Sequence, residues 1–349
     1  MSINNPYEFF VQLHLTERCN LSCSHCYQDR GSSSDEMSLA EIRSVIGEVS
    51  DMLEAWTGTY DLDFTSSFNV TGGEPFLRQD IFKVLEELQT KGFDAYLLTN
   101  GTLINPDMAA SLAGLGLKGV QISIEGPQEV HDAIRGRGSF AASLKGIRNL
   151  LDADLEVTLN TTLSGMNAPY FMDVIELASS LGVQRLGFSR LVPSGSGEKL
   201  LDSMLGREAL KALYGKIFSL NTGRLKIVTG DPVASQFRVP AEADGPEPRP
   251  SGGCAAGVSG LTILPDGTVT PCRRLPVPLG NVRQDSLREI WASSEMLNRL
   301  RDRSAYEGRC GSCGAWSSCR GCRAIAYAFS RATGAGSSLA EDPQCFLTS

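Results

Sequence analysis

The sequence predicts an α/β protein: a partial (β/α)6 barrel of the TIM type, followed by a small cysteine-rich C-terminal domain. Three observations predict this fold. Six short apolar runs alternate with segments of helical periodicity, no cysteine lies between Cys26 and Cys254, and a Pro/Gly-rich stretch precedes the cysteine-rich end. Six strand–helix repeats are fewer than the eight of a closed barrel, so we expect an open one.

The six strand-like runs are rich in aliphatic, aromatic or β-branched residues, and most are bounded by Gly, Asn or Thr. They occupy residues 10–15, 68–71, 95–99, 120–124, 156–163 and 185–189. Ser38 with Glu41 three residues later forms a capping box, which predicts the start of the first helix. The apolar residues that then recur on one face are Ile42, Ile46, Val49 and Leu53. Further helical patterns occupy about 80–91, 106–115, 140–151, 169–181 and 198–220.

The predicted domain boundary lies in residues 239–253, a stretch with four prolines, three glycines and few apolar residues. We therefore expect a barrel at 1–238, a linker at 239–253 and a C-terminal domain at 254–349. Inside that last domain, the Pro265-Asp266-Gly267 sequence predicts the turn of a β-hairpin within residues 261–270.

Composition excludes several classes of function. The net charge of −8 argues against broad binding to nucleic acid or to an anionic membrane. No apolar run approaches the roughly 18 residues of a membrane-spanning helix, and the N-terminus has no features of a secretory signal. These features predict a cytoplasmic protein without nucleic-acid or membrane partners. In that reducing compartment, ten cysteines beside three histidines favour metal or redox chemistry over disulfides.

The first cysteine group has the spacing Cys19-x3-Cys23-x2-Cys26 and follows the first predicted strand. The carboxyl ends of barrel strands form the face on which active sites are built. Three thiolates this close in sequence suit three irons of a [4Fe–4S] cluster and leave the fourth iron without a protein ligand. The alternative is a structural zinc site with His14 or His25 as the fourth ligand.

The sequence CNLSCSHCY from Cys19 to Tyr27 resembles the CxxxCxxC motif of the radical S-adenosylmethionine (SAM) enzymes. The sequence TGGEP at the end of the second strand is similar to the family's GGEP motif. The resemblance implies that SAM chelates the fourth iron and that His25 lies near the adenine. It also implies that Gly72, Gly73 and Glu74 receive the methionine amino group, and two glycines there allow close backbone approach.

Four further residues match positions that contact SAM in this family. Asn100 ends the third strand and Ser123 the fourth, where relatives contact the ribose and carboxylate of SAM. Arg135 matches an arginine that pairs with the SAM carboxylate, a task that suits its planar fork. Asn160 on the fifth strand matches a position on the adenine side. From the residues alone, Arg135 equally fits an ordinary helix-end arginine, and Asn160 a side chain that satisfies backbone groups.

The seven remaining cysteines resemble the SPASM extension of radical SAM maturases, which holds two auxiliary [4Fe–4S] clusters. By position, the resemblance assigns the first auxiliary cluster to Cys254, Cys272 and Cys322. It assigns the second to Cys310, Cys313, Cys319 and Cys345. Seven thiolates cannot fill eight sites, so the first cluster would keep an open iron or take another ligand. The alternative from spacing alone is a pair of zinc-ribbon knuckles.

The resemblance implies that one electron from a reductant such as flavodoxin or ferredoxin cleaves SAM, and that the resulting 5′-deoxyadenosyl radical takes a hydrogen from the substrate. The expected substrate is a ribosomal peptide or protein, with a separate leader-binding protein as a further partner. The alternatives are modification of a haem-type tetrapyrrole side chain, by decarboxylation or a related reaction, and a non-catalytic metal-binding module. No residue is predicted as a substrate acid or base, since the sequence offers no geometry by which to choose.

Overall fold

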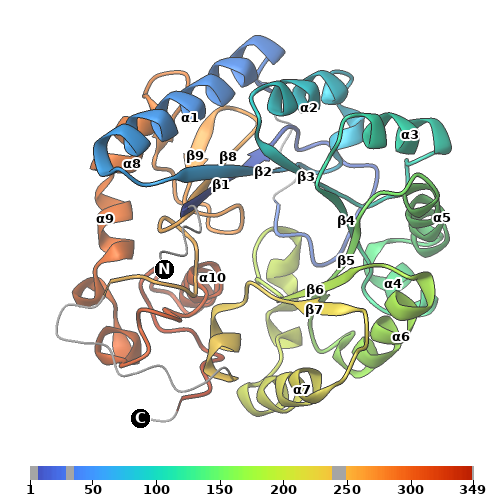
Figure 1. Ribbon diagram of the computed structural model, residues 1–349. Helices are drawn as coiled ribbons and strands as arrows, with labels where there is room; N and C mark the ends of the chain where they lie inside the picture. Colours follow the sequence, from blue (N-terminus) through green and yellow to red (C-terminus); the bar gives the residue numbers. More distant parts are fainter. Residues whose placement is uncertain (1–6, 29–34, 238–248, 348–349) are drawn as a thin grey trace.

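The computed structural model describes residues 7–28, 35–237 and 249–347. One curved sheet runs through it in the order β10-β9-β8-β1-β2-β3-β4-β5-β6-β7, and neighbouring strands from β8 through β1 to β7 are parallel. The strands are β1 (Tyr7–His14), β2 (Phe64–Thr71), β3 (Asp94–Thr99), β4 (Gly119–Ser123), β5 (Val157–Leu163), β6 (Arg185–Arg190), β7 (Lys226–Val228), β8 (Gly260–Ile263), β9 (Thr268–Thr270) and β10 (Gly280–Asn281). Figure 1 shows this sheet as an incomplete ring with helices on its outer side.

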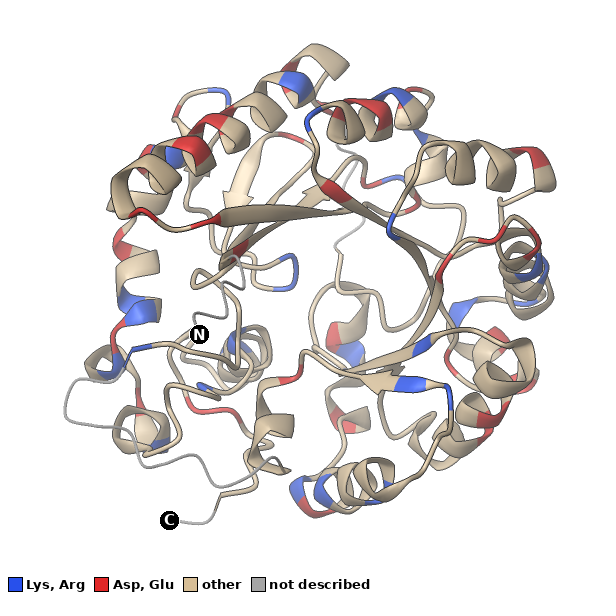
Figure 2. Cartoon of the chain, viewed as in Figure 1, with Lys and Arg blue, Asp and Glu red and all other residues tan. Residues whose placement is uncertain are grey.

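Helices connect the parallel strands and cover the outside of the sheet (Figure 1). The α-helices of the barrel are α1 (Leu39–Tyr60), α2 (Ile81–Thr90), α3 (Pro106–Gly114), α4 (Gln128–Arg135), α5 (Ser139–Asp152), α6 (Phe171–Leu181) and α7 (Arg207–Ser219). Short 3-10 helices are η1 (Pro75–Leu77), η2 (Ala168–Tyr170), η3 (Gly195–Ser203) and η4 (Pro232–Phe237). Many of the Lys, Arg, Asp and Glu positions fall on these outer helices (Figure 2).

The first helix begins where its capping box predicts. The Ser38 side chain accepts the Glu41 N–H, and the Glu41 carboxylate accepts the Ser38 N–H at 2.7 Å. The residues expected on its inner face are all buried against the sheet. Within the sheet, β5 alternates buried and half-buried positions along its length, with one face in the core. This core is the rigid support under the strand ends.

Each of the six predicted runs is a strand, and the partial barrel is confirmed. The structure adds a seventh parallel strand, β7, which pairs with β6. Its three residues are too few to produce a recognisable pattern in the sequence. The structure also adds α4, and it divides the predicted helix at 198–220 into η3 and α7.

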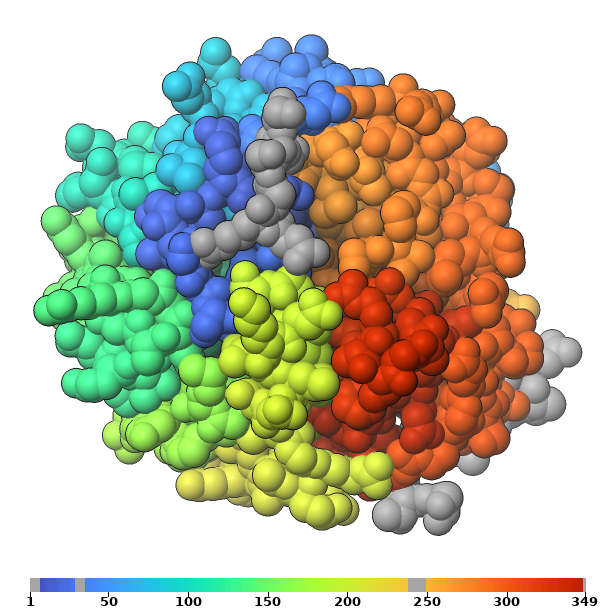
Figure 3. Space-filling view, turned by 180° about the vertical axis from the view of Figure 1, so that it is seen from behind, coloured from blue at the N-terminus to red at the C-terminus, as the bar shows by residue number. Residues whose placement is uncertain are grey.

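The C-terminal part fills the open side of the ring (Figure 1). Its predicted hairpin is formed by β8 and β9, with Gly267 at φ +84° in the turn. Its helices are α8 (Leu287–Ser293), α9 (Glu295–Arg301), η5 (Arg303–Ala305), η6 (Gly308–Ser312) and α10 (Arg323–Ala332). From behind, the red C-terminal residues pack directly against the yellow-green segment that follows β6 (Figure 3).

The two parts of the chain share one sheet, because β8 pairs with β1 over four residues. Most of the predicted linker, residues 239–248, lies outside the described residues. The boundary at 239–253 therefore stays a prediction. Among the described helices, none is both long enough and apolar enough to cross a bilayer.

Candidate active site

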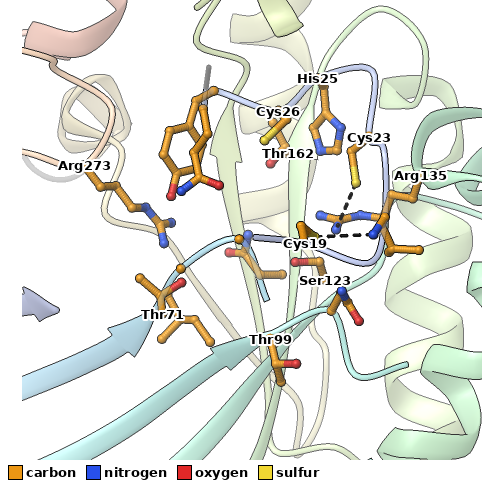
Figure 4. A pocket seen from close by; sticks show the side chains of 18 of the residues that line it. Cys19, Cys23, His25, Cys26, Thr71, Thr99, Ser123, Arg135, Thr162 and Arg273 are labelled. Carbon is orange, nitrogen blue, oxygen red and sulfur yellow. Dashed lines mark hydrogen bonds between the residues drawn. The ribbon is translucent and has the colours of Figure 1, made fainter. Parts of the chain in front are cut away.

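A cavity of about 150 Å³ lies at the carboxyl ends of the barrel strands. Its wall brings together residues from the loop after β1 and from the ends of β2 to β6, as in other barrels (Figure 4). The predicted residues in this wall are Cys19, Cys23, Cys26, His25, Gly72, Gly73, Asn100, Ser123, Arg135 and Asn160. Ser123 and Asn160 lie side by side, since they are register partners on β4 and β5. Glu74 is the one predicted SAM-contact residue that does not line the cavity.

The glycines after β2 allow that loop to pack on the start of the cysteine loop. A Cβ on Gly73 would overlap the carbonyl oxygen of Arg18, and a Cβ on Gly72 would lie 2.6 Å from that of Thr16. The Gly73 N–H donates to the Thr16 carbonyl at 2.7 Å, and the Glu74 N–H to the Arg18 carbonyl at 2.8 Å. These glycines were expected only to allow close approach of a ligand, and the structure adds this contact between two backbones.

Glu74 ties the end of β2 to the end of β3 from below the cavity. Its carboxylate is fully buried and accepts the Thr99 hydroxyl at 2.8 Å and the Asn100 N–H at 2.9 Å. Burial raises the pKa of Glu74 above its usual value, although these hydrogen bonds oppose the shift. Through these hydrogen bonds Glu74 holds the ends of β2 and β3 together beside the cavity.

Asn100 has a contact that the sequence analysis did not predict. Its side-chain amide donates to Asn20 at 2.9 Å, and the Asn20 amide donates to the Thr102 hydroxyl at 2.8 Å. Asn20 follows Cys19 directly in the sequence. The end of β3 therefore holds the cysteine loop in place.

The central buried group of the site is Glu125, which no motif had singled out as a site residue. Its Oε1 accepts from Arg135 Nε at 2.9 Å and lies 3.2 Å from His25 Nε2, while its Oε2 accepts the Thr162 N–H at 2.9 Å. Burial alone would raise the pKa of Glu125, but Arg135 and His25 hold it well below the usual value. The Arg135 fork is thereby directed so that its Nη1 lies 3.9 Å from Cys23 Sγ (Figure 4).

His14 lies at the end of β1 and is buried. Its Nε2 lies 3.2 Å from the Tyr27 hydroxyl and its Nδ1 lies 3.4 Å from the Gln28 amide. Burial and the charge of Arg273 lower the pKa of His14 to about 3. Because both ring nitrogens have protein partners, His14 is poorly placed to be the fourth ligand of a zinc ion at the cysteine triplet.

Two arginines that follow Cys272 also line the cavity, and the sequence analysis missed them. The Arg273 guanidinium carbon lies 5.6 Å from the centroid of the Tyr27 ring. Arg274 donates to the Arg190 carbonyl at 3.4 Å, and its buried Nε has no hydrogen-bond partner among the described residues. Within 7–28, 35–237 and 249–347, neither arginine forms an ion pair with a carboxylate.

The C-terminal cysteines gather in two groups. The four assigned to the second auxiliary cluster line one small cavity: Cys310, Cys313, Cys319 and Cys345. In the other group, Cys322 lies near Cys254, whose charge helps to raise the pKa of the Cys322 thiol. Cys272 and Cys322 both lie near Arg274 and raise the pKa of its guanidinium. Burial raises the pKa of Cys319 to about 11. A metal displaces the thiol proton even where burial raises the thiol pKa, and the grouping of four cysteines around one cavity fits iron–sulfur ligation.

Comparison with known proteins agrees with this geometry. The profile of the Radical SAM superfamily matches residues 13–178, and that of SPASM, an iron–sulfur cluster-binding domain, matches residues 254–323. An AdoMet-dependent heme synthase of Nitratidesulfovibrio vulgaris is 32% identical over 96% of this chain and 91% of its own length. The mycofactocin maturase MftC of Mycobacterium ulcerans is 30% identical over 88% of this chain and 80% of its own length.

The fold has solved counterparts. A structure of anSMEcpe with bound AdoMet superposes with a TM-score of 0.73, covering 97% of this chain and 91% of that one at 20% identity. Fold, cysteine arrangement and sequence together define an enzyme that uses SAM and iron–sulfur chemistry. The chain belongs to the radical SAM superfamily and carries a C-terminal SPASM domain.

This membership determines the cofactors: SAM, a [4Fe–4S] cluster in the radical SAM domain, and auxiliary iron–sulfur clusters in the SPASM domain. It excludes the non-catalytic metal-binding module as the function of the chain. Two different substrate classes remain among the relatives, since one named relative makes heme and the other is a maturase.

Proposed function

We propose that this enzyme uses the SAM-derived radical to modify a side chain of a tetrapyrrole that carries carboxylates. One observation of the structure supports the proposal most: Arg273 and Arg274 line the active-site cavity without a carboxylate partner among the described residues. The heme synthase relative, which aligns with 96% of the chain, supports the same substrate class. The tetrapyrrole reaction, the alternative in the sequence analysis, thereby takes precedence over the peptide reaction.

The roles proposed for the chain follow from the cavity wall. Cys19, Cys23 and Cys26 would hold the [4Fe–4S] cluster, which supplies the electron that cleaves SAM. The residues proposed to contact SAM are His25, Gly72, Gly73, Asn100, Ser123, Arg135 and Asn160. Glu74 would act from beneath the wall, by fixing the ends of β2 and β3. Glu125 would keep Arg135 and His25 in place.

The two arginines would bind and orient the substrate. Charge-assisted hydrogen bonds from guanidinium to carboxylate are strong where water is excluded. Because Arg273 lies over the Tyr27 ring, its guanidinium is held at the cavity while it stays charged. A propionate side chain anchored there would present its carbon–hydrogen bonds to the SAM side of the same cavity. The radical would take one of those hydrogens, and the protein would keep water away from the intermediate.

If the reaction is a decarboxylation, its balance is simple. Removal of one hydrogen atom from the carbon next to the macrocycle leaves a carbon radical. Loss of carbon dioxide and of one electron then converts the propionate into a vinyl group. The electron must go to a one-electron acceptor, for which iron–sulfur chemistry is the suitable class. The reducing electron for SAM would come from a flavodoxin or a ferredoxin.

The test compares a substrate that has free propionates with its uncharged methyl ester, in wild type and in two arginine variants. Anaerobically reconstituted enzyme receives SAM, dithionite and either an iron porphyrin with free propionates or the methyl ester of the same porphyrin. We expect 5′-deoxyadenosine and a decarboxylated product from the free acid, little product from the ester, and a large loss of product in R273Q and R274Q. Product formed by R273Q and R274Q at the wild-type rate would contradict the role of the arginines. The ester tests binding only, because it cannot lose carbon dioxide.

The competing function is maturation of a ribosomal peptide, which the MftC relative favours. The same assay with short peptides encoded near the gene distinguishes the two functions. A peptide that loses or gains mass in a SAM-dependent manner, with no porphyrin product, would replace the proposal. In that case a separate leader-binding protein would be the partner to seek.

A further inference from the structure

One glutamine from the barrel side of the chain reaches the cavity of the second cysteine group. Gln236 lies in η4, outside the segment that contains the C-terminal cysteines. Its side-chain nitrogen donates to Cys319 Sγ at 3.5 Å and to Cys345 Sγ at 3.6 Å. Its side-chain oxygen accepts the Phe346 N–H at 3.1 Å. Because the oxygen is held by a backbone donor, the amide nitrogen is the end that faces the sulfurs.

Other N–H groups point at the same set of sulfurs. The Gly321 N–H donates to Cys319 Sγ and the Ala315 N–H to Cys313 Sγ, each at 3.4 Å. Trp316 lines the same cavity, is 1% exposed, and its buried indole N–H has no acceptor among the described residues. Buried donors are normally paired, so an unpaired indole N–H on a residue that lines a cavity with four cysteines is available to a group that binds among them.

A cation also lines this cavity: Arg320, whose guanidinium donates to the backbone carbonyls of Ser317 and Cys254 at 2.6 and 2.8 Å. Asp342 also lines it, but its carboxylate is paired with Arg190 at 2.8 Å. Gln236 and Trp316 are neutral at every pH of interest, so their effect on a bound group comes from hydrogen-bond dipoles. No titration is needed for that effect.

We propose that Gln236 and Trp316 raise the reduction potential of the second auxiliary cluster by donating hydrogen bonds to its sulfurs. Reduction adds negative charge that spreads onto the sulfurs, so N–H donors stabilise the reduced cluster more than the oxidised one. Gln236 also connects this cluster site to the barrel, because η4 directly follows the strand region of β7. The inference depends on the SPASM domain binding its clusters and is independent of the substrate.

The experiment measures cluster potentials, not turnover. A background in which Cys19, Cys23 and Cys26 are alanine removes the SAM cluster and leaves the auxiliary clusters for a potentiometric titration followed by EPR. Q236M removes the amide while keeping the side-chain length, and W316F removes the indole N–H while keeping an aromatic ring. Q284M is the matched control, since Gln284 is exposed and does not line the cavity.

With iron and sulfide content equal to the parent, we expect one auxiliary signal to shift to more negative potential in Q236M and the same signal to shift in W316F. The other auxiliary signal and both signals of Q284M should not move. Unshifted potentials at full iron content would overturn the proposal, and so would shifts of two different signals. If Q236M loads less iron than the parent, W316F decides by the same criterion. The indole nitrogen of Trp316 forms no hydrogen bond with the described residues, so W316F removes none of their hydrogen bonds.

Discussion

Replacing Arg190 by methionine is expected to destabilise the protein strongly, because one buried guanidinium joins the barrel to the C-terminal segment. Arg190 ends β6 and is 2% exposed. Its Nε and Nη2 donate to Asp231 at 2.6 and 2.8 Å, and its Nη1 and Nη2 donate to Asp342 at 2.9 and 2.8 Å. The carboxylate of Asp342 in turn accepts the N–H of Cys322 at 2.7 Å.

The size of the effect follows from what the variant leaves behind. In R190M two carboxylates remain buried without their cation, and removing one partner of a buried pair costs about 3–5 kcal/mol. For a chain of this size each kcal/mol corresponds to roughly 2 °C in Tm, so we expect a decrease of about 6–10 °C. The control R331M removes an exposed pair with Glu198 and should cost at most about 1 kcal/mol.

Thermal unfolding followed by circular dichroism, on samples of equal iron content, measures both variants. Burial would raise the pKa of Asp342, but Arg190 holds it below the usual value. A lowered carboxyl pKa stabilises the fold above the unfolded pKa of about 4 and loses that contribution as the pH falls through the folded pKa. The difference between wild type and R190M should therefore narrow below about pH 4. A Tm change in R190M no larger than in R331M would refute the role given to Arg190.

Three further predictions concern the site. E125Q should raise the KM for SAM by roughly tenfold or more, since Arg135 loses a charge-assisted partner worth about 1.5–3 kcal/mol. Steady-state kinetics measure this, E129Q on the exposed side of α4 is the control, and an unchanged KM would contradict it. Burial lowers the pKa of His131 to about 4, so the unfolded state binds its proton first and stability falls from about pH 6.5 towards pH 4. H131F should flatten that part of the pH dependence of urea unfolding, and an identical slope would argue against it. C23A should abolish formation of 5′-deoxyadenosine, whereas C313A should retain some SAM cleavage without product, and chromatography of the reaction mixture distinguishes the two.

The barrel was predictable because its information is local. The strands β2 to β6 are largely buried, so their runs of apolar residues are visible in the sequence. Ser38 with Glu41 gives the start of α1 within one turn. The same holds for the cysteine loop, because its three cysteines directly follow the apolar run that predicts β1. Short elements such as β7 and α9 were missed, because three to seven residues carry too little periodicity.

The site was only partly predictable, since several of its residues act through distant partners. Glu125 lies two residues after Ser123, a predicted SAM contact, yet its importance depends on Arg135 and His25, which come from other segments. Arg273 matters because folding brings it over Tyr27, which lies 246 residues earlier in the sequence. A contact between residues so far apart produces no recognisable pattern in the sequence. The position of Arg273 directly after Cys272 was the one local sign that it lies near a cluster site.

The pairing of β8 with β1 has a consequence for how the protein can be divided. In the register of that pair, Gly260 lies opposite Phe10, and a Cβ on Gly260 would overlap the Phe10 carbonyl oxygen. Truncation before β8 would turn β1 into an exposed edge strand with unpaired backbone groups. The cysteine loop begins at the end of β1, so the C-terminal domain supports the strand from which that loop starts. We therefore expect that neither part keeps its structure when it is separated from the other.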